Sequence, residues 1–225
     1  MPVTHGESES VRGVVLAGGE SSRFGAEGDD KALAGVGSEP VLGRIVAVLA
    51  RVTDRRPVVA VRTPEQRARY ADALRDGEVA FVRDDPEYEG PLAGIVGAAA
   101  AVGDPWLFCC GCDMPLLDER AVSWLLARLD RDRPAIDGGR VDAVAIEHPD
   151  GTLNPLHAVY RREPVASLHR LLPRTAGPRA LLAGLESVHT VSPASVPDDV
   201  PLDRSTSNVN TRRQLESVRE EFTRS

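Results

Sequence analysis

Short apolar segments alternate with helix-forming segments along most of this chain, and that order restricts the fold more than any other feature of the sequence. Strands are predicted at 14–16, 58–61, 79–82, 106–110 and 141–146, and helices at 38–52, 64–75, 91–102 and 119–129. Alternation of this kind is typical of a doubly wound parallel sheet whose right-handed crossovers place helices on both faces. The sequence therefore predicts one α/β domain spanning residues 1–225, with 1–10 as a flexible N-terminus.

Capping residues mark the starts of the predicted helices. They are Ser38 with Pro40 in the first turn, Thr63 with Gln66, Asp118, and Thr211 with Gln214. Beyond residue 147 the pattern is less regular. We expect an antiparallel strand at 155–160, helices at 164–172 and 178–185, a late strand at 186–191, a loop at 193–207 and a final helix after Thr211.

The first predicted strand runs directly into a glycine-rich loop, LAGGESSRFG at 16–25. Paired glycines let the backbone approach a ligand closely, and successive N–H groups in such a turn can bind an anion. Arg23 and Lys31 add positive charge beside it. The loop has neither the Gly-Lys-Ser/Thr string of a P-loop nor the GxGxxG spacing of a dinucleotide site. The pattern indicates a phosphate-binding loop, and the alternative is a tight turn without a ligand.

Lysine usage also singles out this loop. Lys31 is the only lysine among the 27 basic residues of the chain. Because arginine serves at every other basic position, the compact ammonium group of Lys31 is expected to have a specific task that a planar guanidinium would not fulfil.

The overall composition excludes several classes of protein. A net charge of −7 argues against a nucleic-acid binder, which would carry a basic patch. No stretch approaches the ~20 apolar residues that span a bilayer, and the polar start of the chain lacks a signal-peptide core, so we expect no membrane association and a cytoplasmic location. Cys109, Cys110 and Cys112 are interpreted as small buried residues, because no second Cys/His cluster supplies ligands for structural zinc.

An aspartate follows the central apolar strand directly, within the segment CDMP at 112–115. Open α/β sheets bind their ligands at the carboxyl ends of the strands. Asp113 at that position is expected to hold Mg²⁺, a cation that takes oxygen ligands and bridges to substrate phosphates. The alternative is that Asp113 only caps a turn before Pro115.

Two further segments are candidates for ligand contacts. In GPLAG, at 90–94, glycines at a helix start either leave N–H groups facing a ligand or permit close packing against the sheet. In NVNT, at 208–211, Asn208 and Asn210 either contribute amide oxygens to a metal or nucleotide site or form a turn before the last helix. His157 lies in the weakly alternating segment after Asn154-Pro155, and His148, His169 and His189 have no partner at recognisable spacing. No nucleophile–base pair is apparent, so triad-type hydrolase chemistry is not supported.

Taken together, LAGGESSRFG with Lys31, GPLAG, CDMP and NVNT resemble the molybdenum cofactor guanylyltransferases, over residues 12 to about 215. The resemblance implies the three-layer α/β/α Rossmann-like nucleotidyltransferase fold, with a mostly parallel sheet that includes an antiparallel strand. It also implies a nucleotide-binding half at 11–135 and an acceptor-binding half with the C-terminal helix at 136–225.

The activity implied by the resemblance is transfer of GMP from GTP to the phosphate of molybdopterin or Mo-molybdopterin, with Mg²⁺ as cofactor and release of pyrophosphate. The implied catalytic residues are Arg23, Lys31 and Asp113. The implied nucleotide-binding residues are Leu16, Ala17, Gly18, Gly19, Lys31, Asp84, Asp85, Gly90, Pro91, Leu92 and Asp113. The metal would be held by Asp113 with Asn210 or Asn208. Other molybdenum cofactor assembly proteins are candidate partners.

Two features depart from the family pattern. Residues 26–30, which are rich in acid, separate the loop from Lys31, and the family's asparagine after the second strand is replaced by Val61-Arg62-Thr63. Base and acceptor therefore stay open. The alternatives are a molybdopterin cytidylyltransferase, a guanylyltransferase acting on a cobamide precursor, and a non-catalytic nucleotide-binding subunit.

Overall fold

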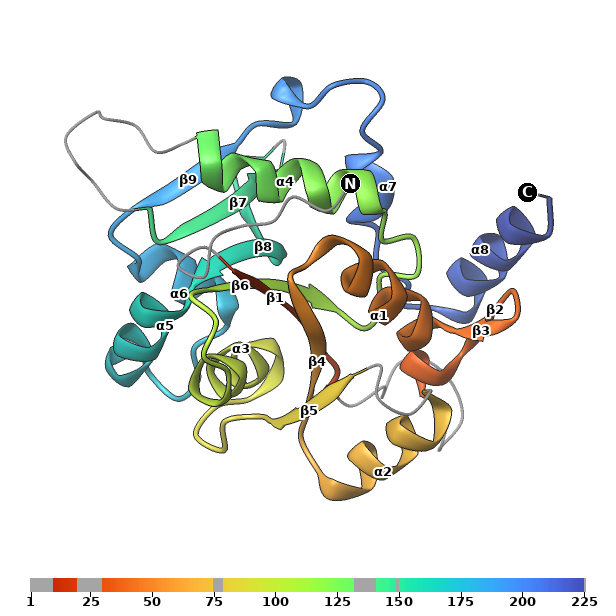
Figure 1. Cartoon of the computed structure of the whole chain (residues 1–225), viewed down its shortest axis with the longest axis horizontal. Coiled ribbons are helices and arrows are strands. Elements are labelled where there is room, and N and C mark those ends of the chain that lie inside the picture. Colours follow the sequence, from red (N-terminus) through yellow and green to blue (C-terminus); the bar gives the residue numbers. More distant parts are fainter. Residues whose placement is uncertain (1–9, 20–29, 75–78, 132–140, 149, 225) are drawn as a thin grey trace.

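A seven-stranded sheet forms the centre of the computed structural model, which describes residues 10–19, 30–74, 79–131, 141–148 and 150–224. Its strands lie in the order β5-β4-β1-β6-β8-β7-β9 (Figure 1). Their bounds are β1 Val11–Leu16, β4 Arg55–Val61, β5 Ala80–Arg83, β6 Trp106–Gly111, β7 Ala143–Glu147, β8 Leu153–Arg161 and β9 Val188–Val191.

All strands of this sheet run parallel except β8, which pairs antiparallel with both β6 and β7. The register places Leu16 of β1 beside Gly111 of β6, so these two strands end at the same edge. The predicted mostly parallel sheet with an antiparallel strand at 155–160 is confirmed.

Helices cover both faces of the sheet. On one face lie α1 Val41–Val52, α2 Pro64–Ala73, α4 Glu119–Arg131, α7 Leu202–Ser205 and α8 Arg212–Arg224, and on the other lie α3 Gly90–Ala101, α5 Arg162–Leu168 and α6 Pro178–Gly184 (Figure 1). Successive strand residues alternate between the two cores. Cys110 packs in the first core and Cys109 in the second, as their adjacent positions predict. Within the described residues, no helix is long and apolar enough to cross a membrane.

Helix α3 approaches the sheet closely because its sequence is rich in glycine and alanine. A Cβ added at Gly94 would lie 2.8 Å from Leu16 Cδ2, and one added at Gly97 would overlap the carbonyl oxygen of Arg83. Both glycines are therefore required by helix–sheet packing, as the small residues of this segment predict.

The predicted capping residues mostly occupy their expected places. Thr63 and Gln66 form a capping box, Asp118 accepts a hydrogen bond from the Arg120 N–H, and Thr211 accepts one from the Gln214 N–H. These three helix starts are confirmed.

Two sequence predictions are wrong. Helix α1 begins at Val41, because Gly35–Val36 (β2) and Glu39–Pro40 (β3) form a hairpin around Gly37, whose φ is +63°. Ser38 thus lies in the hairpin turn, and Pro40 is the N-cap rather than a first-turn residue. The segment 193–207, predicted as a loop, contains the 3-10 helix η4 (Pro193–Ser195) and α7, whose Leu202 and Ser205 are buried. Two further 3-10 helices are η2 (Lys31–Leu33) and η3 (His169–Leu171).

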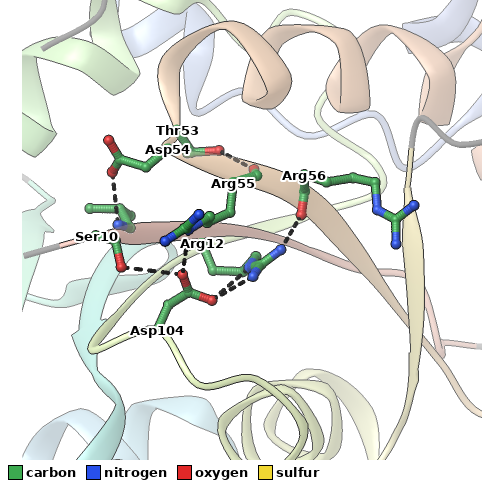
Figure 2. Close-up of polar contacts among 8 residues, drawn as sticks. Ser10, Arg12, Thr53, Asp54, Arg55, Arg56 and Asp104 are labelled. Atoms are coloured by element: carbon green, nitrogen blue, oxygen red, sulfur yellow. Dashed lines mark hydrogen bonds and ion pairs between the residues drawn. The ribbon is translucent and has the colours of Figure 1, made fainter. Parts of the chain in front are cut away.

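A cluster of polar side chains lies at the amino-terminal ends of β1 and β6 (Figure 2). Buried Asp104 accepts hydrogen bonds from Arg12 Nε at 2.7 Å and from Ser10 Oγ at 3.2 Å, and Arg55 lies 3.8 Å away. The Val11 N–H donates to Asp54 at 2.9 Å. The buried Asp104 carboxylate is thus paired with two arginines, which offset the cost of burying its charge.

Candidate active site

The carboxyl ends of β1, β4 and β6 are tied together where the glycine loop begins. The Ala17 N–H donates to the carbonyl oxygen of Ala60 at 3.0 Å, and the Cys112 N–H donates to that of Leu16 at 3.2 Å. A pocket opens at this edge. Eight of the predicted site residues line it: Leu16, Gly18, Gly19, Lys31, Asp84, Gly90, Pro91 and Asp113.

Asp84 directly follows β5 and lines the pocket next to Gly18 of the glycine loop. Its side chain is 7% exposed, and its Oδ1 atom is buried without a hydrogen-bond partner among the described residues. Burial raises the pKa of Asp84 to about 6, and the charge of Arg62 lowers it in part. A Cβ added at Gly18 would overlap Asp84 Oδ2, so glycine is required there for the loop to pass the carboxylate. A carboxylate that lines a pocket is suited to a ligand that donates hydrogen bonds.

Lys31 is the first residue of η2, and its side chain lies next to residues of two distant segments, Asp113 and Asn210. Its Nζ atom donates to Asn210 Oδ1 at 3.0 Å and lies 4.0 Å from Asp113 Oδ2. Asp30 is the N-cap of η2, and its carboxylate accepts a hydrogen bond from the Ala32 N–H. This bond holds the backbone at Lys31 in place. The lysine side chain is 16% exposed, so its charge is held close to the pocket rather than in bulk solvent.

Asp113 lies two residues beyond β6, and its carboxylate is 23% exposed. Burial raises its pKa, while Lys31 and a backbone hydrogen bond lower it in part. A Cβ at Gly111 would lie 2.5 Å from Asp113 Oδ1, so the preceding glycine leaves room for the carboxylate. Desolvation is thus the largest influence on the Asp113 carboxylate, and Lys31 offsets it only in part.

The α3 end of the pocket is formed by backbone. Gly90 adopts a φ of +61°, a left-handed conformation that favours glycine, and Pro91 follows in the first turn. The N-cap residue Glu89 makes no side-chain capping bond, so the first N–H groups of this 12-residue helix are left for another acceptor.

Other predicted site residues lie outside the pocket lining. Ala17 and Leu92 are buried in the two cores, so only their backbone is available to a nucleotide. The Asp85 carboxylate accepts from the Glu87 N–H at 2.8 Å in a local turn. The Asn208 side chain is exposed. Arg23 and most of the acidic insertion lie outside the described residues. The roles assigned to all these residues stay predictions.

Four lining residues were not among the predicted site residues: Gly94, Gly111, Cys112 and Leu156. Gly94 and Cys112 belong to motifs that the sequence does single out, and Gly111 directly precedes one. Leu156 carries no such signal. It enters the pocket because β8 lies next to β6 and its register with β7 shifts at this point, between residues 154 and 158.

The donor set fits Mg²⁺ held jointly with a nucleotide. No group of three or more His, Cys, Asp or Glu side chains in the described residues forms a complete metal site. Mg²⁺ does not need one, because it usually binds through one or two carboxylates together with substrate phosphates. Asp113 supplies such a carboxylate beside the glycine loop. The amide oxygen of Asn210 is nearby, because it accepts a hydrogen bond from the same Lys31 ammonium group that lies 4.0 Å from Asp113.

Solved structures first define the class of the fold. The structure of molybdopterin-guanine dinucleotide biosynthesis protein A from Archaeoglobus fulgidus matches with a TM-score of 0.74 at 19% identity, covering 95% of this chain and 100% of that one. A CMP:2-keto-3-deoxy-manno-octonic acid synthetase complexed with CTP matches with a TM-score of 0.63 at 18% identity, covering 96% and 99%. The fold is thus the Rossmann-like fold of nucleotidyltransferases.

The sequence itself then defines the family. The model of the MobA-like NTP transferase domain matches residues 13–191, and the chain belongs to this family. A probable molybdenum cofactor guanylyltransferase from Natronomonas pharaonis is 32% identical over 218 residues, covering 92% of this chain and 96% of the relative. A molybdenum cofactor guanylyltransferase from Pseudomonas entomophila is 30% identical over 173 residues, covering 76% and 80%. The resemblance read from the sequence motifs is confirmed, and the chain is a nucleotidyltransferase.

Proposed function

We propose that this nucleotidyltransferase transfers GMP from GTP to the phosphate of molybdopterin or its molybdenum-loaded form, with release of pyrophosphate. The names of its relatives support this choice of nucleotide and acceptor. The observation that carries the proposal is the meeting of Lys31, Asp113 and Asn210 beside the glycine loop, although they lie far apart in the sequence.

The reaction joins two anions, and this defines what the protein must contribute. The acceptor phosphate attacks the α-phosphorus of the nucleotide in line, and the pyrophosphate leaves on the opposite side. Positioning and charge neutralisation supply most of the catalysis in such transfers. Lys31 places a fixed positive charge next to the glycine loop, whose backbone would hold the phosphates. No protein nucleophile takes part, and an ionised acceptor phosphate needs no general base.

Mg²⁺ would be held by Asp113, with Asn210 as the nearby amide, and when bound it supplies further neutralisation of phosphate charge. Lys31 contacts both of these side chains. It therefore holds the Asn210 amide near Asp113, at the rim of the pocket that Lys31 and Asp113 line. Asp84 lines the pocket beside Gly18, and its carboxylate could accept hydrogen bonds from donor groups of the nucleoside.

The direct test is pyrophosphate release by the purified full chain with Mg²⁺, molybdopterin and each of GTP, CTP and ATP in parallel. We expect turnover with GTP and not with the other two. Turnover with CTP alone would instead identify a cytidylyltransferase. GTP turnover only with a cobamide precursor phosphate would change the acceptor. Nucleotide binding without turnover on any acceptor would identify a non-catalytic subunit.

The role of Asp113 is tested by Asp113→Asn, which keeps the size of the side chain and removes its charge. We expect kcat to fall about 100-fold or more. The matched control is Asp118→Asn, five residues further on, since asparagine caps the start of α4 as well as aspartate does. Near-normal turnover in Asp113→Asn with Mg²⁺ present would remove Asp113 from the metal role.

A further inference from the structure

Two fully buried polar side chains meet behind the site and take no part in the proposed chemistry. His157 of β8 and Ser205 of α7 are both 0% exposed, and His157 Nε2 lies 3.0 Å from Ser205 Oγ. The imidazole ring also packs edge-on against Phe108, with ring centroids 5.1 Å apart. Burial lowers the pKa of His157 to about 4, so the ring is neutral at pH 7, and either tautomer can share a hydrogen bond with a hydroxyl group.

Ser205 joins a third element to this pair. Its Oγ atom accepts a hydrogen bond from the Asp118 N–H at 3.1 Å, at the start of α4. A second bond lies further along the same segments, where the Val209 N–H donates to the carbonyl oxygen of Asp113 at 2.8 Å. The segments 113–118 and 205–210 are therefore bonded to each other near both ends, and His157 ties this unit to the sheet.

We call the bonds of Ser205 and Val209, together with His157, the tether. The tether holds the chain on one side of Asn210, and on the other side the Asn210 N–H donates to Gln214 Oε1 at 2.8 Å. Residues 207–210 belong to no helix or strand, and of these only Val209 is buried. The segment has little packing of its own, so its position depends on its few anchored points. Asn210 follows Val209 and accepts the hydrogen bond from Lys31. A shift of the segment would therefore weaken this hydrogen bond, which helps to hold the Lys31 ammonium group beside Asp113.

We propose that His157 and Ser205 are positioning residues that hold the Asn208–Asn210 segment against Asp113 and Lys31. This inference rests on the proposed function, because it concerns the same reaction centre. Their effect is expected on the chemical step. In the part of the chain that the structure describes, the nucleoside end of the pocket, at Gly18, Asp84 and Gly90, is not hydrogen-bonded to His157 or Ser205, so binding of GTP should change little.

The first test measures the tether without any reaction. Amide hydrogen exchange, followed by NMR in the full chain, reports on the Val209 N–H. Ser205→Ala removes the shared hydroxyl group, and we expect protection of Val209 to fall about tenfold or more. The Cys109 N–H, in the centre of β6, reports on global stability, so its protection should fall less than that of the Val209 N–H. Unaltered protection at Val209 would overturn the proposal.

The second test separates kcat from KM. Ser205→Ala and His157→Leu should each lower kcat about 10- to 100-fold, because small displacements of reacting groups cost rates of this size, while the KM for GTP stays within about twofold. His157→Gln restores most of the activity, since its amide nitrogen can reach Ser205 in place of Nε2.

The matched control is Ser10→Ala, which also removes a buried hydroxyl group but at the opposite edge of the sheet (Figure 2). It should lower Tm by a similar amount and leave kcat unchanged. An equal loss of kcat in this variant, or a loss expressed only in the KM for GTP, would overturn the positioning role. If the wild-type chain does not turn over GTP, the proposed function fails, whereas the exchange measurement still tests the tether.

Discussion

Replacing Gly18 by alanine should damage the protein through one identified clash. The added Cβ would overlap Asp84 Oδ2 and lie 2.7 Å from its Cγ. Asp84 has little freedom to move, because its backbone N–H donates to the carbonyl oxygen of Val61 and the residue is only 7% exposed. Overpacking of this kind costs about 1–3 kcal/mol, and we expect the upper end because the carboxylate is enclosed.

Urea unfolding at pH 7 of Gly18→Ala, Asp84→Ala and the double variant measures the effect as a cycle. In the Asp84→Ala background the added methyl group meets no carboxylate, so Gly18→Ala should cost no more than about 0.5 kcal/mol, which leaves a coupling energy of about 2 kcal/mol. Gly19→Ala is the matched control, because nothing lies within 4 Å of its added Cβ. Equal losses in Gly18→Ala and Gly19→Ala, or additivity in the cycle, would refute the reasoning.

Three further predictions concern buried charge. Because burial raises the pKa of Asp84 from 3.8 to about 6, the folded state keeps a proton that the unfolded state has lost, so stability should fall as pH rises from about 4 to about 6 and then level off. Asp84→Asn should remove this decrease, at most about 3 kcal/mol in urea unfolding, and an unchanged profile would contradict the assignment. Lys31→Arg should lower kcat about tenfold or more despite the retained charge, because a planar guanidinium cannot keep the Lys31 contacts with Asn210 and Asp113, and an unaffected rate would show that lysine has no specific task. Asp104→Ala leaves Arg12 without its carboxylate and should destabilise the fold by about 3 kcal/mol while kcat stays normal, since the cluster lies at the far edge of the sheet, and a stability loss under about 0.5 kcal/mol would contradict it.

Helices and strands that carry a clear local sequence pattern could be predicted from the sequence. The capping box of Thr63 and Gln66 and the apolar run of β6 each carry their own signal, and both are present in the structure. The predicted start of α1 at Ser38 is wrong, because the chain around Gly37 forms a hairpin and the helix begins only at Val41. Ser38 is a residue type that suits a helix N-cap and a hairpin turn alike, so its identity does not distinguish the two. Short helices such as α7 are stabilised by the burial of Leu202 and Ser205 rather than by helix propensity.

The candidate site, too, was predictable where local motifs define it and needed the structure where distant contacts do. Motifs predicted which residues belong to it, because a glycine loop and an aspartate at strand ends carry a chemical meaning that does not depend on distant contacts. The choice between Asp84 and Asp85 needed the structure, which directs Asp84 into the pocket and Asp85 into a local turn. No local pattern links His157 to Ser205, because the two residues are 48 positions apart in the sequence.

The sequence by itself determined the alternation of strands and helices, the glycine loop and the family to which the chain belongs, because all of these depend on residue types at short spacing. Only the tertiary structure decided that Lys31 meets Asn210, 179 residues further on, and that Leu156 enters the pocket. Such contacts depend on the order in which the strands pair. That order results from burying both faces of the whole sheet at once, and no local pattern encodes it.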